Sequence, residues 1–214
     1  MLAASCAGAT VSPERTSAAY LALGDSFTIG TGSRPDEAFP AVLVRLWAAE
    51  GRAVSLTNPA VNGYTTDDLI ATELPLAGTI RPSLVTLLIG ANDLVRGVPE
   101  DRYRARLVSI FRGLADAGVP ASAVYALPQP DWSASPTARA FGKPDELRAR
   151  IERFNAIIKE EAERGGGTYL DIFPLMRDQA RNGMVAPDGL HPSREAHAQW
   201  AAALKPLLVP AARP

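Results

Sequence analysis

Short apolar runs alternate along the chain with longer segments in which apolar residues recur every three or four positions. The apolar runs lie at residues 20–23, 54–56, 84–89, 124–127 and 168–172. The run at 84–89 is apolar almost throughout, which is typical of a strand covered on both faces in a parallel sheet. The pattern therefore predicts five strands, of which the run at 84–89 is covered on both faces.

The segments between these runs have the spacing of amphipathic helices. They lie at residues 38–50, 65–74, 99–117, 144–164 and 193–208. In the third of them Tyr103, Leu107 and Leu114 fall on one face, and Gly118 then follows as a stop signal. Strands that alternate with helices predict an α/β fold, a doubly wound three-layer α/β/α sandwich around a mostly parallel five-stranded sheet.

The patterned part of the chain shows no repeat and no linker, so residues 20–210 are expected to form one domain. Residues 1–19 are small, polar and poorly patterned, which predicts a flexible lead-in. The irregular stretch inside the domain is 128–143, which is rich in Pro, Ser and Ala. It predicts a loop after the fourth strand, at the sheet edge where ligands bind.

The composition excludes some classes of function. The chain has 214 residues, with 22 Lys and Arg against 23 Asp and Glu and a formal net charge of −1. Such a balance gives no long-range attraction to nucleic acid or to anionic membranes. No apolar run approaches the roughly 20 residues that a membrane-spanning helix needs, so we expect no membrane span.

The single cysteine, Cys6, excludes a disulfide within the chain. Residues 2–6, Leu-Ala-Ala-Ser-Cys, resemble the end of a bacterial lipoprotein signal, whose cysteine becomes lipidated. No basic or apolar stretch precedes them, so a signal here would be truncated, and the alternative is an Ala-rich tail. Both interpretations stay open, and with them a lipid anchor at Cys6 and the choice between an extracytoplasmic and a cytoplasmic location.

Polar segments follow the predicted strands at the points where the strands end. Gly24-Asp25-Ser26 follows the first strand, residues 58–63 follow the second and residues 90–93 follow the third, while residues 188–191 precede the last helix. In open α/β sheets, ligands bind outside the carboxyl ends of the strands. We therefore expect these four distant segments to converge at one edge of the sheet.

Ser26 and His191 are the candidate nucleophile and base. A serine hydroxyl is a poor nucleophile until a base removes its proton, and histidine, with an ordinary pKa of about 6.5, suits that task at neutral pH. Of the two histidines, His197 falls inside a helical pattern, whereas His191 lies in a loop flanked by Gly and Pro. Asp188, three residues earlier, can orient the imidazole through Nδ1; the alternative is a surface aspartate in an Asp-Gly turn.

Acyl transfer also needs hydrogen-bond donors aimed at the oxyanion that forms in the transition state. The chain offers the backbone N–H groups of Ser26 and Gly63 and the side-chain amide of Asn92. Each is a weak signal alone, because Asn62-Gly63 also suits an ordinary turn and residues 90–93 an ordinary strand exit. Only the combination of the segments makes the assignment specific.

Taken in order, four blocks resemble the SGNH hydrolases, also called GDSL-type lipases and esterases. The blocks are Gly24-Asp25-Ser26-Phe27-Thr28-Ile29-Gly30, residues 58–65 (NPAVNGYT), Gly90-Ala91-Asn92-Asp93 and Asp188-Gly189-Leu190-His191-Pro192. The resemblance implies a flavodoxin-like sandwich and a serine esterase or acyl hydrolase that cleaves carboxylic esters through an acyl-enzyme, without a metal or cofactor. It matches Ser26, Asp188 and His191 to the catalytic triad. It matches Ser26, Gly63 and Asn92 to the oxyanion hole.

Two positions differ from the usual family pattern or vary within the family. Phe27 stands where the name-giving leucine usually lies, which we expect to affect packing only. Tyr64 follows Gly63 at a position that varies in the family, and its ring either lines the substrate pocket or packs beneath the loop. Short-chain carboxylic esters, thioesters, lysophospholipids and acetylated sugars all stay open as substrates. The stretch 128–143 is short for a lipase lid, which favours small soluble esters with short acyl chains.

The same residues allow two rival functions. A non-catalytic phosphate- or ligand-binding module would use the backbone N–H groups of residues 24–26, although no Gly-Lys-Ser/Thr follows them. A metal-dependent hydrolase would use Asp25, Asp188 and His191, although two histidines without close His or Cys spacing are unlike known zinc sites. The sequence carries no signal for an oligomeric state.

Overall fold

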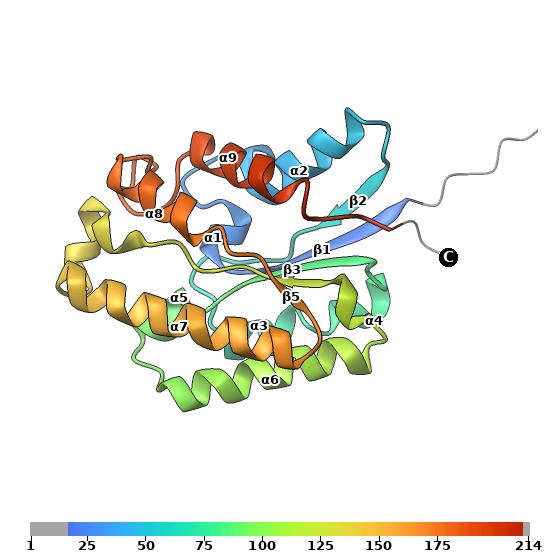
Figure 1. The fold of residues 1–214 in the computed structure, drawn as a ribbon, viewed down its shortest axis with the longest axis horizontal. Helices are drawn as coiled ribbons and strands as arrows, with labels where there is room; N and C mark the ends of the chain where they lie inside the picture. Colours follow the sequence, from blue (N-terminus) through green and yellow to red (C-terminus); the bar gives the residue numbers. More distant parts are fainter. Residues whose placement is uncertain (1–16, 212–214) are drawn as a thin grey trace, which may run out of the picture.

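The structure, a computed structural model, describes residues 17–211 and has a five-stranded parallel sheet at its centre (Figure 1). The strands are β1 (Ala18–Gly24), β2 (Val54–Thr57), β3 (Leu84–Leu88), β4 (Val124–Ala126) and β5 (Thr168–Tyr169). Their order is β2-β1-β3-β4-β5, and each neighbouring pair is parallel. The predicted α/β fold class is confirmed, and the strand order is that of flavodoxin-like folds.

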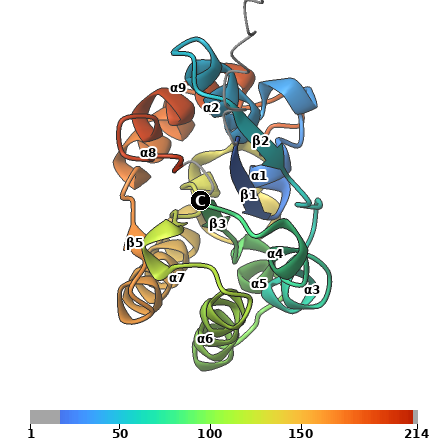
Figure 2. The ribbon, with the colours of Figure 1, turned by 90° about the vertical axis from the view of Figure 1, so that its right-hand side faces the viewer.

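Helices cover both faces of the sheet (Figure 2). One face carries α2 (Phe39–Ala48) and α9 (Arg194–Leu204), and the other carries α3 (Thr66–Thr72), α6 (Glu100–Asp116) and α7 (Pro144–Arg164). α2 packs against α9, and α6 packs against both α3 and α7. This layering explains why the helices have apolar stripes while the central strands are apolar on both sides.

The central strands lie in the core because both of their faces are covered. Every residue of β1 and of β3 is buried, which explains why these runs show no polar alternation. Tyr20 of β1 packs edge-on against Trp47 of α2, with ring centroids 5.9 Å apart, and its hydroxyl is hydrogen-bonded to Thr86 of β3 at 2.8 Å. The strand that leads to Ser26 is therefore fixed by the most buried part of the fold.

The structure contains short helices that the apolar pattern did not predict. They are α1 (Ser26–Ile29), α4 (Leu76–Ile80), α5 (Ala91–Val95) and α8 (Phe173–Arg181). Such short helices offer too few repeats of the 3.6-residue period for a sequence pattern to reveal them. β1 also begins at Ala18, before the predicted run, so the last residues of the expected lead-in belong to the sheet.

The stretch 128–143, predicted to be an irregular loop, contains two 3₁₀ helices, η3 (Trp132–Ala134) and η4 (Pro136–Ala140). Asp131 caps η3 by accepting a hydrogen bond from the backbone N–H of Ser133 at 3.2 Å. The hydroxyl of Ser135 donates to the carbonyl of Trp132 at 2.7 Å. The stretch therefore forms an ordered wall rather than an open loop.

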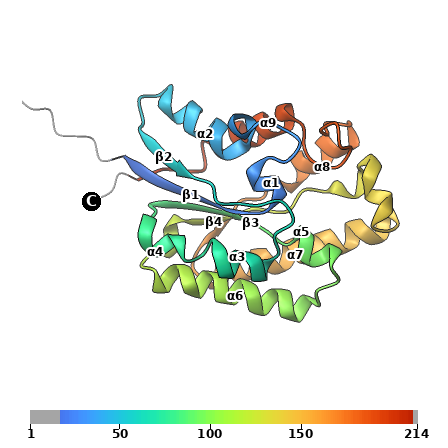
Figure 3. The same ribbon diagram turned by 180° about the vertical axis from the view of Figure 1, so that it is seen from behind.

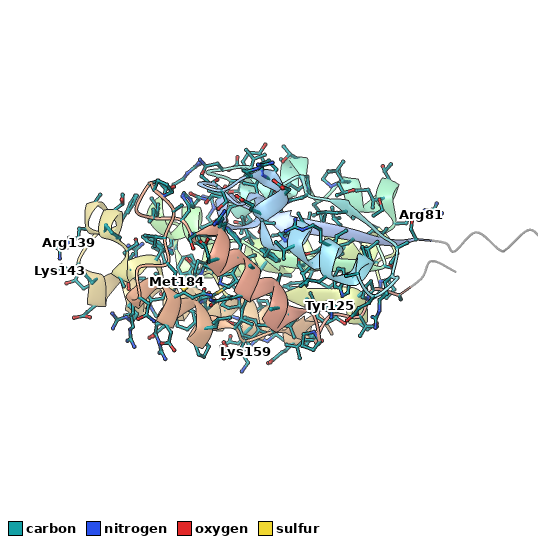
Figure 4. All side chains as sticks on the ribbon, turned by 90° about the horizontal axis from the view of Figure 1, so that it is seen from above. Arg81, Tyr125, Arg139, Lys143, Lys159 and Met184 are labelled. Carbon is teal, nitrogen blue, oxygen red and sulfur yellow. The ribbon has the colours of Figure 1, made fainter. Side chains whose placement is uncertain are left out.

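The carboxyl ends of the strands gather at one end of the molecule, where α1, α5 and α8 also lie (Figures 1 and 3). Figure 4 marks this end with Arg139 and Lys143, and marks the opposite end, where the strands begin, with Arg81. The stretch 128–143 extends along the carboxyl end (Figure 1). The segments expected to carry the chemistry therefore meet where ligands bind in open α/β sheets.

Within residues 17–211, no helix is both long enough and apolar enough to cross a membrane. Cys6 and most of the predicted lead-in, residues 1–16, lie outside the described part of the chain. The lipid anchor considered for Cys6 therefore stays a prediction.

Candidate active site

The turn between β1 and α1 presents Ser26 at the start of a short helix. Asp25 caps this helix, and its Oδ1 accepts a hydrogen bond from the backbone N–H of Phe27 at 3.0 Å. At Gly24 a Cβ would overlap Thr28 Oγ1 and the carbonyl oxygen of Leu88, so only glycine lets the turn lie this close to β3. Ser26 is 5% exposed, so its hydroxyl lies in a largely enclosed position.

The loop at residues 58–65 joins β2 to α3 and carries Gly63. The backbone of Gly63 has a φ of +86°, a conformation that side chains other than glycine's rarely adopt. The amide of Asn58 donates to the carbonyl of Thr28 at 3.0 Å, which ties the loop to α1. Among the described residues, the N–H groups of Gly63 and Ser26 donate no hydrogen bond, so both are available to a ligand.

Two side chains from the segment after β3 hold the other end of this loop. Asn92 Nδ2 donates to the carbonyl of Tyr64 at 2.9 Å and lies 3.5 Å from Asp25 Oδ2. Arg96 Nη2 donates to the carbonyl of Gly63 at 2.9 Å. The Tyr64 side chain is half-buried and does not line the pocket described below. The structure therefore does not support the predicted position in which its ring lines the substrate pocket.

The loop at residues 185–192 places His191 beside Asp188. His191 Nδ1 lies 2.7 Å from Asp188 Oδ2, while Asp188 Oδ1 accepts the backbone N–H groups of Leu190 at 2.9 Å and of His191 at 3.0 Å. Partial burial raises the pKa of Asp188, but these hydrogen bonds and the His191 ring outweigh it and leave the pKa below its usual value. Asp188 is therefore bound to its own loop and is not a free surface carboxylate.

One pocket of about 110 Å³ brings the predicted residues together. Its lining residues are Ser26, Phe27, Asn62, Ala91, Asn92, Val95, Trp132, Phe141, Leu190 and His191. Ser26, Asn92 and His191 thus share one cavity, and Asn62 places Gly63 next to it. Among the described hydrogen bonds, none joins the Ser26 hydroxyl to His191. The two side chains are placed together by lining the same pocket.

Part of the apolar wall of this pocket comes from residues that had no predicted role. Trp132 and Phe141 belong to the stretch 128–143, and their rings meet nearly at right angles with centroids 5.6 Å apart. Leu190 lies within the fourth block but had no predicted role. The available signal was the position of the stretch after the fourth strand, which identified the segment but not the side chains.

Buried carboxyl groups adjoin the turn that presents the serine. Glu73 accepts the backbone N–H of Gly24 at 3.0 Å. Burial raises the pKa of Asp25 to about 7 and that of Glu73 to about 8; repulsion by Asp93 adds to the first shift and repulsion by Asp25 adds to the second. Among residues 17–211, no group of three or more His, Cys, Asp or Glu side chains is arranged to hold a metal ion.

His197, the histidine not chosen as base, lies in the core. Its ring stacks on Phe39 with centroids 6.4 Å apart and meets Trp200 at 5.0 Å. Neither ring nitrogen has a hydrogen-bond partner among the described residues. Burial, with a smaller contribution from the nearby His191, lowers the pKa of His197 to about 4, so its ring is neutral at pH 7.

The chain is similar to known esterases and acylhydrolases in sequence and in fold. A family model described as the GDSL-like lipase/acylhydrolase family matches residues 22–199. The chain is 25% identical to the esterase TesA of Pseudomonas aeruginosa over 88% of both chains, and 30% identical to an arylesterase of Vibrio mimicus over 46% of this chain and 49% of that protein. A solved lipase/acylhydrolase from Enterococcus faecalis superimposes with a TM-score of 0.72 at 21% identity, covering 91% of this chain and 98% of that one.

Proposed function

Because the chain belongs to the GDSL-like lipase/acylhydrolase family, it is an ester-hydrolysing enzyme, and we propose that Ser26 is its nucleophile and His191 its base. The observation that carries this proposal is the single pocket lined by Ser26, Asn92 and His191, which come from three distant segments. Because Asp188 occupies Nδ1 of the imidazole, Nε2 is the nitrogen left for the serine.

The proposed reaction passes through an acyl-enzyme. His191 Nε2 takes the Ser26 proton as Oγ attacks the ester carbonyl carbon, and the tetrahedral intermediate then expels the alcohol, which His191 protonates. The acyl group stays on Ser26 until water, deprotonated by His191, attacks it. Collapse of the second intermediate releases the acid and returns the proton to Ser26.

The negative oxygen of each intermediate needs donors that are not already bound. The N–H groups of Ser26 and Gly63 meet this condition within the described residues. Asn92 uses one of its amide protons on the carbonyl of Tyr64, and its second proton has only a long 3.5 Å contact to Asp25. We propose that this second proton and the two N–H groups form the oxyanion hole.

Asp188 has the role of orienting His191 and stabilising its charged form. Since the pKa of Asp188 lies below its usual value, the carboxylate stays ionised at neutral pH and opposes the positive charge that the imidazole gains. The pocket of about 110 Å³ is small beside the roughly 300–1,000 Å³ of sites that hold drug-sized ligands. The substrates we propose are therefore small esters with short acyl chains.

The proposal is tested with Ser26→Ala and His191→Ala, assayed on p-nitrophenyl butanoate. Each change should lower kcat by a factor on the order of 10⁶, as in other serine hydrolases. A fluorophosphonate probe should label the unmodified protein but not Ser26→Ala. Ser109→Ala, which changes an exposed serine on α6, is the matched control and should keep full activity. Wild-type turnover by Ser26→Ala would end the proposal.

A further inference from the structure

A second, smaller cavity lies directly behind the pocket. Trp132 and Leu190 line both, so these two side chains form the wall that separates them. The second cavity has a volume of about 20 Å³, enough for about one water molecule. It lies between η3, α8 and α9, where Met176, Met184 and Trp200 line it; Figure 4 labels Met184.

The wall is rigid. Trp132 is 3% exposed, and its Nε1–H donates to Gln129 Oε1 at 3.2 Å. Its backbone carbonyl is held by the hydroxyl of Ser135, and its ring is held by contact with Phe141. The backbone of Leu190 is held by its own N–H, which donates to Asp188. A side chain held in this way limits the pocket by its volume and does not swing aside as a gate.

The second cavity suits an alkyl chain and not a polar group. Its polar lining residues have partners of their own: Gln179 Oε1 accepts the indole N–H of Trp200 at 2.6 Å, and Asp131 is paired with Arg148 at 3.3 Å. Met176 and Met184 have unbranched thioether side chains, which adapt to irregular apolar shapes. The cavity is too small to take a chain while Trp132 keeps its place.

The two ends of the pocket differ in exposure. Val95 is 42% exposed and Phe141 is 38% exposed, so they form its mouth, whereas Trp132 closes the inner end. In the reaction proposed above, the alcohol must leave while the acyl group stays attached to Ser26. The inner end is therefore the end that fits the acyl chain, and the mouth is the end that fits the departing alcohol.

We propose that Trp132 and Leu190 set the acyl-chain limit of this esterase, and that the methionine-lined cavity behind them is an extension of the acyl site that the two side chains block. This inference rests on the proposed function of Ser26 and His191. Wild-type kcat/KM should fall once the acyl chain reaches the wall. Removing the wall should join the two cavities and admit longer chains.

The test is a series of p-nitrophenyl esters from acetyl to decanoyl, assayed with the unmodified protein and with Trp132→Leu. Each newly accommodated methylene should raise kcat/KM about fourfold. The ratio of octanoyl to butanoyl kcat/KM should therefore rise at least about tenfold in the variant. An unchanged ratio in a variant that still reacts with the fluorophosphonate probe overturns the inference.

Further variants keep the test decisive if Trp132→Leu does not fold. Leu190→Ala changes a half-buried residue of the same wall and should shift the ratio in the same direction. Ala180→Phe, which fills the second cavity, should reverse the gain when added to Trp132→Leu. Val108→Ala, at an exposed position on α6, should leave the ratio unchanged.

A second series separates the acyl side from the alcohol side. For alkyl acetates, in which only the alcohol lengthens, the wall variants should show the same chain-length profile as the unmodified protein. A shift confined to this series would overturn the acyl assignment. If the unmodified protein neither hydrolyses any ester nor reacts with the fluorophosphonate, the proposed function itself fails, which is a result distinct from an unchanged ratio.

Discussion

The two loops that bring the proposed catalytic groups together are held in place in opposite ways. The 185–192 loop is fixed mainly from within, because Asp188 accepts two backbone N–H groups of the loop and the His191 ring. Its outside support is Thr137 of η4, which donates to the carbonyls of Asp188 at 2.9 Å and of Gly189 at 3.1 Å. The 58–65 loop is fixed by side chains from elsewhere, with Asn92 and Arg96 bound to its carbonyl oxygens. One loop therefore carries most of its own support, whereas the geometry of the other depends more on the segment after β3.

Because the two loops are supported differently, a substitution can lower activity in two distinct ways. A change within the 185–192 loop alters the charge and the orientation of the base at once. A change in the segment after β3 acts on the 58–65 loop from outside and leaves the base untouched. Four variants, given from the largest expected effect to the smallest, test whether the two supports are as independent as the contacts indicate.

Asp188→Asn should give the largest loss among the supporting residues. It removes the charge that stabilises the imidazolium and weakens the acceptor for the N–H groups of Leu190 and His191. By analogy with other triads, kcat should fall by about 10⁴, less than for His191→Ala. Steady-state kinetics on p-nitrophenyl butanoate measures both. Equal losses in the two variants would contradict a purely orienting and stabilising role.

Asn92→Ala should lower kcat by roughly 10² to 10³, as the loss of one oxyanion donor does elsewhere. The change also removes the bond to the carbonyl of Tyr64, so the 58–65 loop loses one of its supports. KM should change little, because the donor acts mainly in the transition state. A large rise in KM with unchanged kcat would argue that Asn92 binds the substrate and does not stabilise the oxyanion.

His197→Phe should make the free energy of unfolding less sensitive to acid, because it removes a buried imidazole from the core beneath the 185–192 loop. His197 has a pKa of about 4 when folded, against an ordinary 6.5, so the unfolded chain binds a proton first. The free energy of unfolding is therefore unaffected by His197 above pH 6.5, and it falls by up to about 3 kcal/mol as the pH drops toward 4. Urea unfolding at pH 7 and pH 4.5 measures this loss. The variant should lose less stability over that range, and an identical loss would place the acid sensitivity elsewhere.

Arg96→Ala should give the smallest effect, about a tenfold fall in kcat with little change in KM. It removes the charged hydrogen bond to the carbonyl of Gly63 without touching the base. Because the Arg96 side chain is 58% exposed, the free energy of unfolding should fall by less than about 1 kcal/mol. Arg102→Ala, which breaks an exposed ion pair with Asp67, is the matched control. Equal kinetics for the two variants would mean that Gly63 needs no support from Arg96.

The same comparison explains what the sequence could and could not predict. Asp188 and His191 are three residues apart, and a contact at that distance is a local property that a turn can supply. Arg96 and Gly63 are 33 residues apart, so their contact depends on how α5 packs against the 58–65 loop. The helical pattern around His197 was also accessible, and the structure has this residue inside α9.

The long strands and helices could be predicted because many residues repeat the same pattern. The short elements could not, and they are the ones that shape the pocket. Trp132 faces the pocket only because η3 is capped by Asp131 and held by Ser135. Glu73 is buried because it meets Gly24, which lies 49 residues earlier in the chain. Tertiary contacts of this kind leave no periodic signal in the sequence.

The burial of β1 determines how the nucleophile should respond to thermal fluctuations. The strand lies between two neighbours in the sheet and is covered on both faces, so its amide protons should exchange with solvent only when the whole domain opens. Ser26 follows this strand almost directly. The 58–65 loop has no such protection and should exchange through local opening at far lower cost. If heating stops turnover while the amide protons of β1 stay protected from deuterium exchange, the loops have opened locally. The strand that positions Ser26 is then still folded.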